Sequence, residues 1–276
     1  MRKVGVIVYG AAAYLVFLGV FLYAIGFVEN VGVPTSLDGP SSMATMPALA
    51  VDALLLALFS VQHSVMARPA FKLRWTRLVP REVERSTYVL LASLVLALVF
   101  WQWRPVRAVV WHVDLPPAAV LLRATSLLGW FVVLTSTFMI SHLELFGLRQ
   151  VWLHARDLPY RPVGFTTRLL YQFVRHPIML GFLMAFWATP AMTVGHLLFA
   201  LLTTGYILVG VHFEERDLLA EHGERYATYR RDVPMLLPMP TRTARSRAAT
   251  ETKGEAAGIG ARGRPPGTET AEAPHV

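Results

Sequence analysis

Long apolar segments without charges alternate with short polar segments over most of the chain. The first covers 4–28, and further ones lie near 44–66, 86–103 and 124–140. Each is close to the length of about 20 residues that lets a helix cross roughly 30 Å of hydrocarbon. The uncharged segment 177–213 is too long for one crossing, and Thr, Pro and Gly residues near its middle predict two short helices joined by a tight turn. The pattern predicts an all-α integral membrane bundle of about six spans, ending in a short helical hairpin.

The charges of the connecting segments predict the orientation of this bundle. Basic residues concentrate in the loops after the second and fourth apolar segments: Arg68, Lys72, Arg74, Arg77, Arg81 and Arg85, and Arg149, Arg156, Arg161, Arg168 and Arg175. The loop after the first segment has no Lys or Arg. Because Lys and Arg accumulate in cytoplasmic loops, both basic loops and both termini are expected in the cytoplasm. The first apolar segment follows Arg2 and Lys3 and precedes no convincing small-residue cleavage site, so we interpret it as a retained span.

Composition supports a membrane protein and excludes several other classes. Only 16% of the 276 residues are charged and 54% are hydrophobic, whereas a soluble domain carries about 25% charged residues. The absence of cysteine excludes disulfides, thiolate metal sites and a cysteine nucleophile. The net charge of +8 follows from the basic loops, so we expect no nucleic-acid partner. Residues 1–240 are predicted to form one transmembrane domain, and 241–276, without apolar periodicity, a disordered cytoplasmic tail.

Two ionisable residues fall within the second apolar segment. Asp52 and His63 share a helix face but lie roughly 16 Å apart along its axis, so they cannot form one acid–base pair. An ionisable group inside a membrane helix normally faces protein or water. Either Asp52 is structural and His63 merely interfacial, or the two mark a polar line that leads to a functional site.

Further polar side chains gather at the expected cytoplasmic ends of the third and fourth spans. Arg85 and Tyr88 form one i, i+3 pair, and Ser141 and Glu144 form another with His142 beside them, so each pair projects from one helix face. Any one of these residues is more typical of an interfacial anchor than of a catalyst. Their convergence at one depth favours a cavity.

The C-terminal hairpin carries the densest group of charged residues. Arg175 and His176 stand immediately before the fifth span, and Glu214 and Glu215 end the sixth. A hairpin would bring these segments to the same membrane surface. A cation beside two carboxylates suits a zwitterionic, ribose-containing ligand, because arginine binds carboxylates and glutamate accepts from hydroxyl or ammonium groups. The alternative is a salt bridge that only closes the hairpin.

These C-terminal residues resemble a motif of the isoprenylcysteine carboxyl methyltransferase family of integral membrane enzymes. The family pattern is Arg-His-Pro-x-Tyr-x-Gly, then Glu-Glu-x-x-Leu and Gly-x-x-Tyr-x-x-Tyr, and it is matched here by 175–181, by 214–218, and by Gly223, Tyr226 and Tyr229. Met179 replaces the usual tyrosine, so any role of that hydroxyl is absent. The rest of the chain is similar to a narrower branch, the bacterial methanethiol S-methyltransferases, with the NnrU-like proteins alongside. Segments 62–68, 84–88, 142–150 and 179–190 carry this similarity.

The resemblance implies transfer of a methyl group from S-adenosylmethionine to a small thiol, most simply methanethiol, in a bacterial inner membrane. The products would be dimethyl sulfide and S-adenosylhomocysteine, with no metal involved. The cofactor-binding part would cover about 141–238 and include Arg175, His176, Pro177, Met179, Leu180, Gly181, His212, Glu214 and Glu215.

A simple thiol has a pKa well above 7, so a base or a charge that stabilises the thiolate is useful. Depth and residue type make His63 the first choice of base, with Asp52, His142 and Glu144 behind it. Arg85 would stabilise the thiolate and Tyr88 would position it.

Three other functions stay open. A methyltransferase for a lipid-like acceptor predicts a side opening between spans. Membrane sterol reductases resemble the same C-terminal part and use a nicotinamide cofactor, but they usually have more spans. An NnrU-like accessory protein predicts that no cofactor binds. No pattern in the sequence predicts an oligomeric state.

Overall fold

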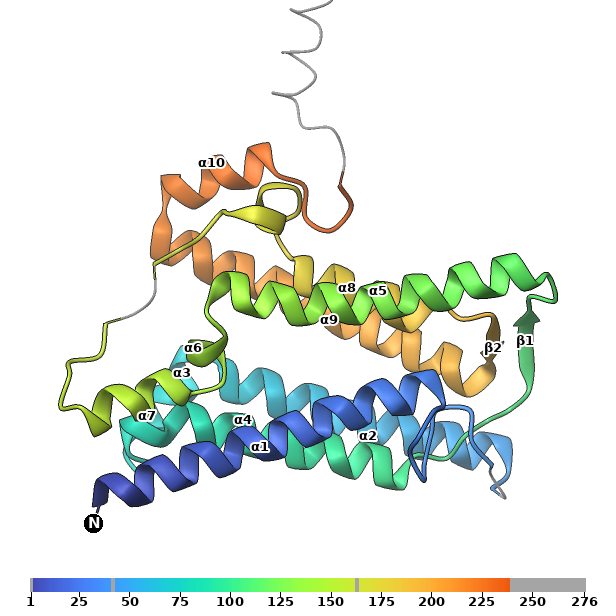
Figure 1. The fold of residues 1–276 in the computed structure, drawn as a ribbon, viewed down its shortest axis with the longest axis horizontal. Coiled ribbons are helices and arrows are strands. Elements are labelled where there is room, and N and C mark those ends of the chain that lie inside the picture. The colour runs from blue at the N-terminus through green and yellow to red at the C-terminus, as the bar shows by residue number, and fades with distance from the viewer. Residues whose placement is uncertain (1, 41–42, 162–163, 239–276) are drawn as a thin grey trace, which may run out of the picture.

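The computed structural model describes residues 2–40, 43–161 and 164–238, and almost all of its elements are helices (Figure 1). In chain order they are α1 (Arg2–Glu29), α2 (Thr45–Ala67), α3 (Pro69–Trp75), α4 (Arg81–Gln102), β1 (Val109–His112), α5 (Pro116–Ile140), α6 (His142–Leu145), α7 (Leu148–Ala155), the 3-10 helix η1 (Leu169–Gln172), α8 (Pro177–Trp187), β2 (Ala191–Thr193), α9 (Val194–His222) and α10 (Glu224–Asp232). The predicted tail 241–276 lies outside the described residues.

Helix length and composition identify an integral membrane protein. Within the described residues, five helices are long and apolar enough to cross a membrane: α1, α2, α4, α5 and α9. The apolar helix α8 has only 11 residues, which is about 16 Å and half of the roughly 30 Å hydrocarbon layer. The predicted bundle of membrane helices is confirmed, whereas the sixth crossing stays a prediction.

The all-α prediction needs a correction, because β1 and β2 form a small antiparallel sheet. Val109 pairs with Thr193 and His112 with Ala191. The break near 189–195 is therefore not a simple tight turn. Pro190 has no N–H and favours extended backbone before it, and Thr193 then caps α9 by accepting from the backbone N–H of His196.

Two helix boundaries also differ from the prediction. Helix α5 begins at Pro116, well before 124, because two prolines suit the first turn of a helix. This places the charged Arg123 inside a membrane helix. Helix α9 continues past Phe213 to His222 and has 29 residues, because the charged segment after Phe213 contains good helix formers. The final hairpin thus pairs one short helix with one long helix.

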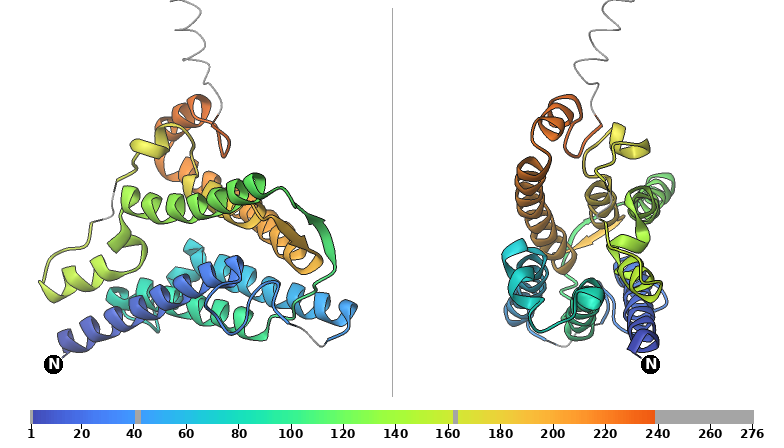
Figure 2. Two further views of the ribbon diagram at one scale, coloured as in Figure 1. Left: turned by 45° about the vertical axis from the view of Figure 1, so that its right-hand side comes forward. Right: turned by 90° about the vertical axis from the view of Figure 1, so that its left-hand side faces the viewer.

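The helices form two layers (Figures 1 and 2). Helices α1, α2 and α4 lie in one layer, and α5, α8 and α9 in the other. An aromatic core lies between them and includes Phe27, Phe100, Trp103, Trp130, Phe186 and Phe199. Helices α5 and α8 are in backbone contact, because a Cβ on Gly129 would lie 2.5 Å from the carbonyl oxygen of Gly181. Small residues allow this close approach in membranes.

The two ends of the bundle differ in structure (Figure 1). At the end that carries the N-terminus lie the short helices α3, α6, α7, η1 and α10, and we call it the helical end. At the opposite end lie β1, β2 and the 30–38 segment, and we call it the sheet end. Most of the basic loop residues identified in the sequence lie at the helical end.

Candidate functional site

Glu215 of α9 is the centre of a buried ion-pair network at the helical end. Arg175 Nε and Nη2 each lie 2.7 Å from Glu215 Oε1, and His176 Nε2 lies 3.2 Å from the same oxygen. Arg230 Nε lies 3.3 Å from Glu215 Oε2. The structure therefore brings together the two predicted segments, which are 40 residues apart in the chain. The remaining Arg175 donor, Nη1, bonds to the backbone oxygens of Arg230 and Val233.

Backbone pairing fixes the position of this network. The backbone N–H groups of Arg175 and His176 donate to the carbonyl oxygens of Pro234 (2.9 Å) and Met235 (3.2 Å). The Tyr229 hydroxyl of α10 donates to the backbone oxygen of Tyr171 at 2.5 Å. Burial raises the pKa of Tyr229 to about 12, so this hydroxyl keeps its proton at neutral pH. The segment after α10 is thus tied to the start of α8.

Two polar groups beside the network are left without strong protein partners. The Glu214 side chain is 50% exposed, and His176 Nδ1 lies 3.6 Å from its Oε2. The Tyr226 hydroxyl is buried and has no hydrogen-bond partner among the described residues. Burial raises the pKa of Tyr226, so it offers a proton to donate. Glu214 is therefore accessible to a ligand and the Tyr226 hydroxyl keeps an unused donor, whereas both Glu215 oxygens already have partners.

The other predicted cofactor-binding residues spread over different surfaces. Pro177 is buried at the start of α8, with Met179 and Leu180 half-buried after it. Gly181 faces α5, where an added Cβ would lie 2.6 Å from the carbonyl oxygen of Gly129. His212 is exposed on α9 with its ring beside Phe213. Of the predicted set, Arg175, His176, Glu214 and Glu215 form one contiguous group.

A second group unites three of the predicted catalytic residues. His63 Nε2 of α2 lies 2.9 Å from the Tyr88 hydroxyl of α4. The Arg85 guanidinium lies 5.2 Å from the centre of the Tyr88 ring, and Arg85 Nε donates to the backbone oxygen of Leu145 at 2.9 Å. His63 Nδ1 is buried without a partner among the described residues. A free ring nitrogen in such a place is suited to a proton-transfer role.

Helix α9 connects the two groups through residues that the sequence pattern did not single out as functional. The Tyr206 ring meets the His63 ring edge-on at 6.3 Å between centroids. Arg68 follows α2, lies 5.2 Å from the Phe213 ring centre and pairs with Asp217 at 3.1 Å. Tyr206 and Glu214 are about 12 Å apart along the helix and eight positions apart, a spacing that favours one helix face. This spacing is the one feature of the sequence that could have pointed to Tyr206 as a neighbour of the site.

The structure places Asp52 away from both groups. Its side chain is fully buried, and Oδ1 accepts from the backbone N–H of Arg104 at 2.8 Å. Arg104 follows the C-terminal end of α4, toward the sheet end. Asp52 thus links α2 to the end of α4, roughly 16 Å from His63 along α2. The polar line predicted between Asp52 and His63 is therefore not continuous.

His142 and Glu144 belong to the connection between α5 and α7. His142 lies between Thr137, with Oγ1 2.8 Å from Nδ1, and Tyr14, with its hydroxyl 2.8 Å from Nε2. Glu144 accepts from Arg149 (2.8 Å), Gln150 (2.9 Å) and Tyr160 (2.5 Å). Burial and the neighbouring Glu144 raise the pKa of Tyr160 to about 12. Both ring nitrogens of His142 and both carboxylate oxygens of Glu144 thus already have protein partners.

The fold and the site define a helical integral membrane protein whose His63–Tyr88 and Glu214–Glu215 groups both lie toward the helical end. The sequence is 60% identical to a methanethiol S-methyltransferase of Mycobacterium tuberculosis over 242 residues, which are 88% of this chain and 99% of the relative. It is 51% identical to a methanethiol S-methyltransferase of Crocosphaera subtropica over 86% of this chain and 93% of the relative. The chain therefore belongs to the methanethiol S-methyltransferase family.

More distant comparisons place this family in a wider group. Nurim of Mus musculus is 32% identical over 181 residues, which are 63% of this chain and 69% of Nurim. No protein-family model matches the sequence, and no solved structure matches it. The membership confirms the resemblance to a thiol S-methyltransferase branch, and it implies that the protein uses a methyl donor.

Proposed function

We propose that this membrane protein transfers a methyl group from S-adenosylmethionine to methanethiol and releases dimethyl sulfide and S-adenosylhomocysteine. The observation that carries the proposal is the His63–Tyr88 pair, with one buried ring nitrogen free, beside a helix that also bears the half-exposed Glu214. Family membership at 60% identity supports this acceptor over the lipid-like acceptor, the reductase and the accessory protein.

The residues around Glu214 fit the proposed cofactor. The Glu214 carboxylate suits the ribose hydroxyls or the ammonium group, and the unpartnered Tyr226 hydroxyl suits a carboxylate. Arg68 interacts electrostatically with Glu214 and adds a cation to the same region. Arg175 is occupied by Glu215 and two backbone oxygens, so we assign it to shaping the site and leave ligand contact to Glu214. When bound, S-adenosylmethionine supplies a methyl group activated by its sulfonium.

His63 is the proposed base for the thiol. The Tyr88 hydroxyl lies 3.5 Å from the His63 backbone oxygen and can donate there while accepting from His63 Nε2–H. This tautomer leaves Nδ1 unprotonated and free to accept the thiol proton. Arg85, whose guanidinium lies 5.2 Å from the centre of the Tyr88 ring, favours the thiolate electrostatically. Methyl transfer then requires only that the thiol sulfur and the sulfonium of S-adenosylmethionine be aligned.

The other predicted catalytic residues have positioning roles in this proposal. Asp52 holds the end of α4, and His142 and Glu144 hold the connection that supplies the Leu145 carbonyl to Arg85. In this proposal His63 is thus the only side-chain base near the acceptor thiol.

The proposed orientation places the helical end and both termini in the cytoplasm of a bacterial inner membrane. S-adenosylmethionine is charged and cytosolic and cannot enter lipid, so its site must open there. Methanethiol is small and apolar and can arrive through the bilayer. The basic loop residues at the helical end support the same orientation.

The test uses protein purified in detergent, with S-adenosylmethionine and methanethiol as substrates and headspace gas chromatography for dimethyl sulfide. We expect His63→Ala to lower kcat by roughly 10²-fold or more at pH 7, with partial recovery at pH 9, where the thiolate forms in solution. Glu214→Ala is expected to raise KM for S-adenosylmethionine. Arg77→Ala, an exposed change in the α3–α4 loop, is the matched control.

Two results would contradict separate parts of the proposal. Activity of His63→Ala equal to wild type from pH 6 to 9 would show that His63 is not the base. Binding of S-adenosylhomocysteine in calorimetry without dimethyl sulfide formation would show that the acceptor is a different molecule.

A further inference from the structure

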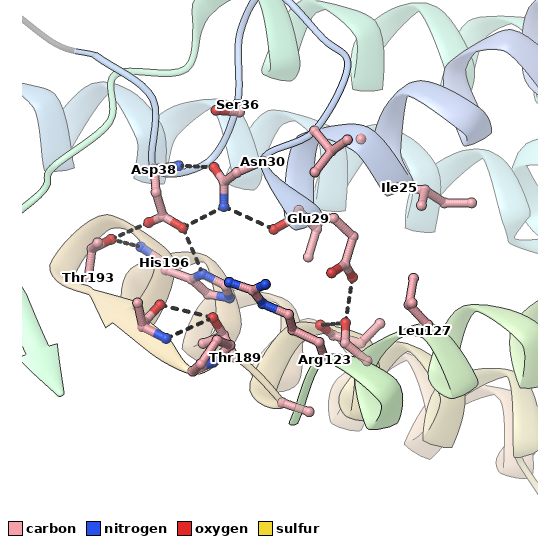
Figure 3. Close-up of a pocket in the computed structure, with 18 of the residues that line it drawn as sticks. Ile25, Glu29, Asn30, Ser36, Asp38, Arg123, Leu127, Thr189, Thr193 and His196 are labelled. Carbon is pink, nitrogen blue, oxygen red and sulfur yellow. Dashed lines mark hydrogen bonds and ion pairs between the residues drawn. The ribbon is translucent and has the colours of Figure 1, made fainter. Parts of the chain in front are cut away.

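The sheet end contains a cavity of about 980 Å³ that the proposed reaction does not use. The C-terminal end of α1, the 30–38 segment, β1, α5, the end of α8 and the start of α9 line it. Its base is held in place by buried His196, which donates from Nε2 to the Phe186 carbonyl oxygen (2.9 Å) and has Nδ1 3.2 Å from Asp38 Oδ2. Thr193 also donates to Asp38 at 2.5 Å (Figure 3).

Packed aromatic side chains separate this cavity from the candidate active site. Phe27, Trp130, Phe186 and Phe199 belong to one core cluster between the two ends of the bundle. His196 and Glu214 lie on the same helix, about 27 Å apart along its axis. The cavity is therefore a second site and not an extension of the first.

The cavity combines unpaired positive charges with an available carboxylate. Arg107 and Arg123 both line it, and among the described residues neither guanidinium has a hydrogen-bond or ion-pair partner. Figure 3 shows the Arg123 side chain extending from α5 into the cavity. Glu29 accepts from Ser126 (2.5 Å) and Trp130 (3.1 Å), both at Oε1. Glu29 Oε2 receives no donor from the part of the chain that the structure describes.

The surface around Arg123 is apolar and exposed, as expected of a helix face in contact with lipid. Val120, Leu121, Leu127 and Leu128 on the same helix are 50% to 67% exposed, and Leu127 also lines the cavity. Arg123 is seven residues from the start of α5, which is about 10 Å along the helix and near headgroup depth. An arginine at this depth is stabilised when it meets a phosphate, which its guanidinium binds through paired hydrogen bonds.

We propose that this cavity binds the headgroup of a zwitterionic aminophospholipid. The phosphate binds Arg123 and Arg107, and the ammonium group binds Glu29 Oε2. An anionic lipid without an amine satisfies the arginines but leaves the Glu29 carboxylate without a cation. The charge pattern therefore selects phosphoethanolamine over phosphoglycerol.

The test is native mass spectrometry of the detergent-purified protein, titrated with phosphatidylethanolamine, with phosphatidylglycerol of the same acyl chains, and with free O-phosphoethanolamine. We expect tighter binding of phosphatidylethanolamine than of the other two. Arg123→Ala should lower its affinity roughly tenfold or more, because a charge-assisted contact is lost. Glu29→Gln should remove the preference over phosphatidylglycerol and leave phosphate binding intact. Arg77→Ala is the control for a basic residue elsewhere.

Each other outcome would overturn a defined part of the proposal. Equal binding of the two lipids to wild type would overturn the role of Glu29. Unchanged binding to Arg123→Ala, with an unfolding temperature equal to wild type, would overturn the phosphate site. Free O-phosphoethanolamine that competes as well as the lipid would show that the site serves a soluble ligand.

Discussion

His63 and His142 differ in how many of their ring nitrogens are hydrogen-bonded. Both ring nitrogens of His142 have partners, and its ring stacks on Phe138 at 4.2 Å. His63 has one bonded and one free nitrogen. The sequence could single out both histidines as polar groups near helix ends. It could not show which nitrogens are used, because the partners Tyr14 and Tyr88 come from other helices.

A pH dependence of stability follows for His142. Burial lowers its pKa from the ordinary value of 6.5, so the unfolded chain binds a proton more readily than the folded one. The His142 contribution to stability is therefore complete above about pH 6.5 and is lost as the pH falls. We expect the thermal unfolding temperature in detergent to fall between pH 7 and 5, and to fall less in His142→Gln. The exposed His212→Gln should keep the wild-type slope, and an identical slope in both variants would contradict this assignment.

Among elements, the contact between α5 and α8 depends on two glycines. A Cβ on Gly129 would lie 2.7 Å from the backbone nitrogen of Ala185, and one on Gly181 would lie 2.9 Å from that of Val133. Backbone atoms cannot move aside as flexible side chains do, so the two helices would have to separate. We expect Gly129→Ala and Gly181→Ala each to destabilise the fold by about 1–3 kcal/mol.

Gly205→Ala in α9 is the matched control, because its Cβ meets nothing within 4 Å. This change should be neutral or stabilise the helix by up to about 1 kcal/mol. Thermal unfolding of the three variants in one detergent distinguishes them. Equal stability of all three would show that α5 and α8 are not closely packed.

The membrane helices could be predicted because hydrophobic length is a strong local signal. Helices α1, α2 and α4 match the apolar segments to within a few residues. The start of α5 was missed because Arg123 interrupts the apolar pattern, although prolines at 116–117 mark a helix start. The β1–β2 pairing was missed because it joins segments more than 70 residues apart. Long-range pairing of short strands leaves little trace in sequence.

For the whole molecule, the distribution of basic loop residues predicts its orientation in the membrane, and this orientation can be measured. The chain has no cysteine, so a single introduced cysteine is the only thiol available for labelling. With an impermeant maleimide on intact cells, we expect Asp114→Cys at the sheet end to react. Arg77→Cys at the helical end should react only after the cells are opened. The reverse labelling pattern would show that the bundle has the opposite orientation, with the proposed cofactor site outside the cell.

The candidate site could be predicted in part, because its residues lie at helix ends that the span pattern aligns. That alignment correctly joined Arg175 with the Glu215 region and Arg85 with Tyr88. It could not separate Asp52 from His63, because spacing along one helix does not reveal which neighbouring helix each residue meets. The charged cavity at the sheet end was also missed, since its residues come from six separate segments.

The extended segment between α8 and α9 has a consequence for membrane insertion during synthesis. Peptide groups that leave a helix near lipid need other partners, and each missing one costs several kcal/mol. Here the backbone of 106–113 provides them: Val194 N–H donates to Ala108 and Gly195 N–H to Val106, while Pro190 accepts from Val113. Because synthesis proceeds from the N-terminus, this partner strand has left the ribosome before the interrupted segment emerges. The order of the segments along the gene therefore lets the last hairpin insert with its hydrogen-bonding partner already in place.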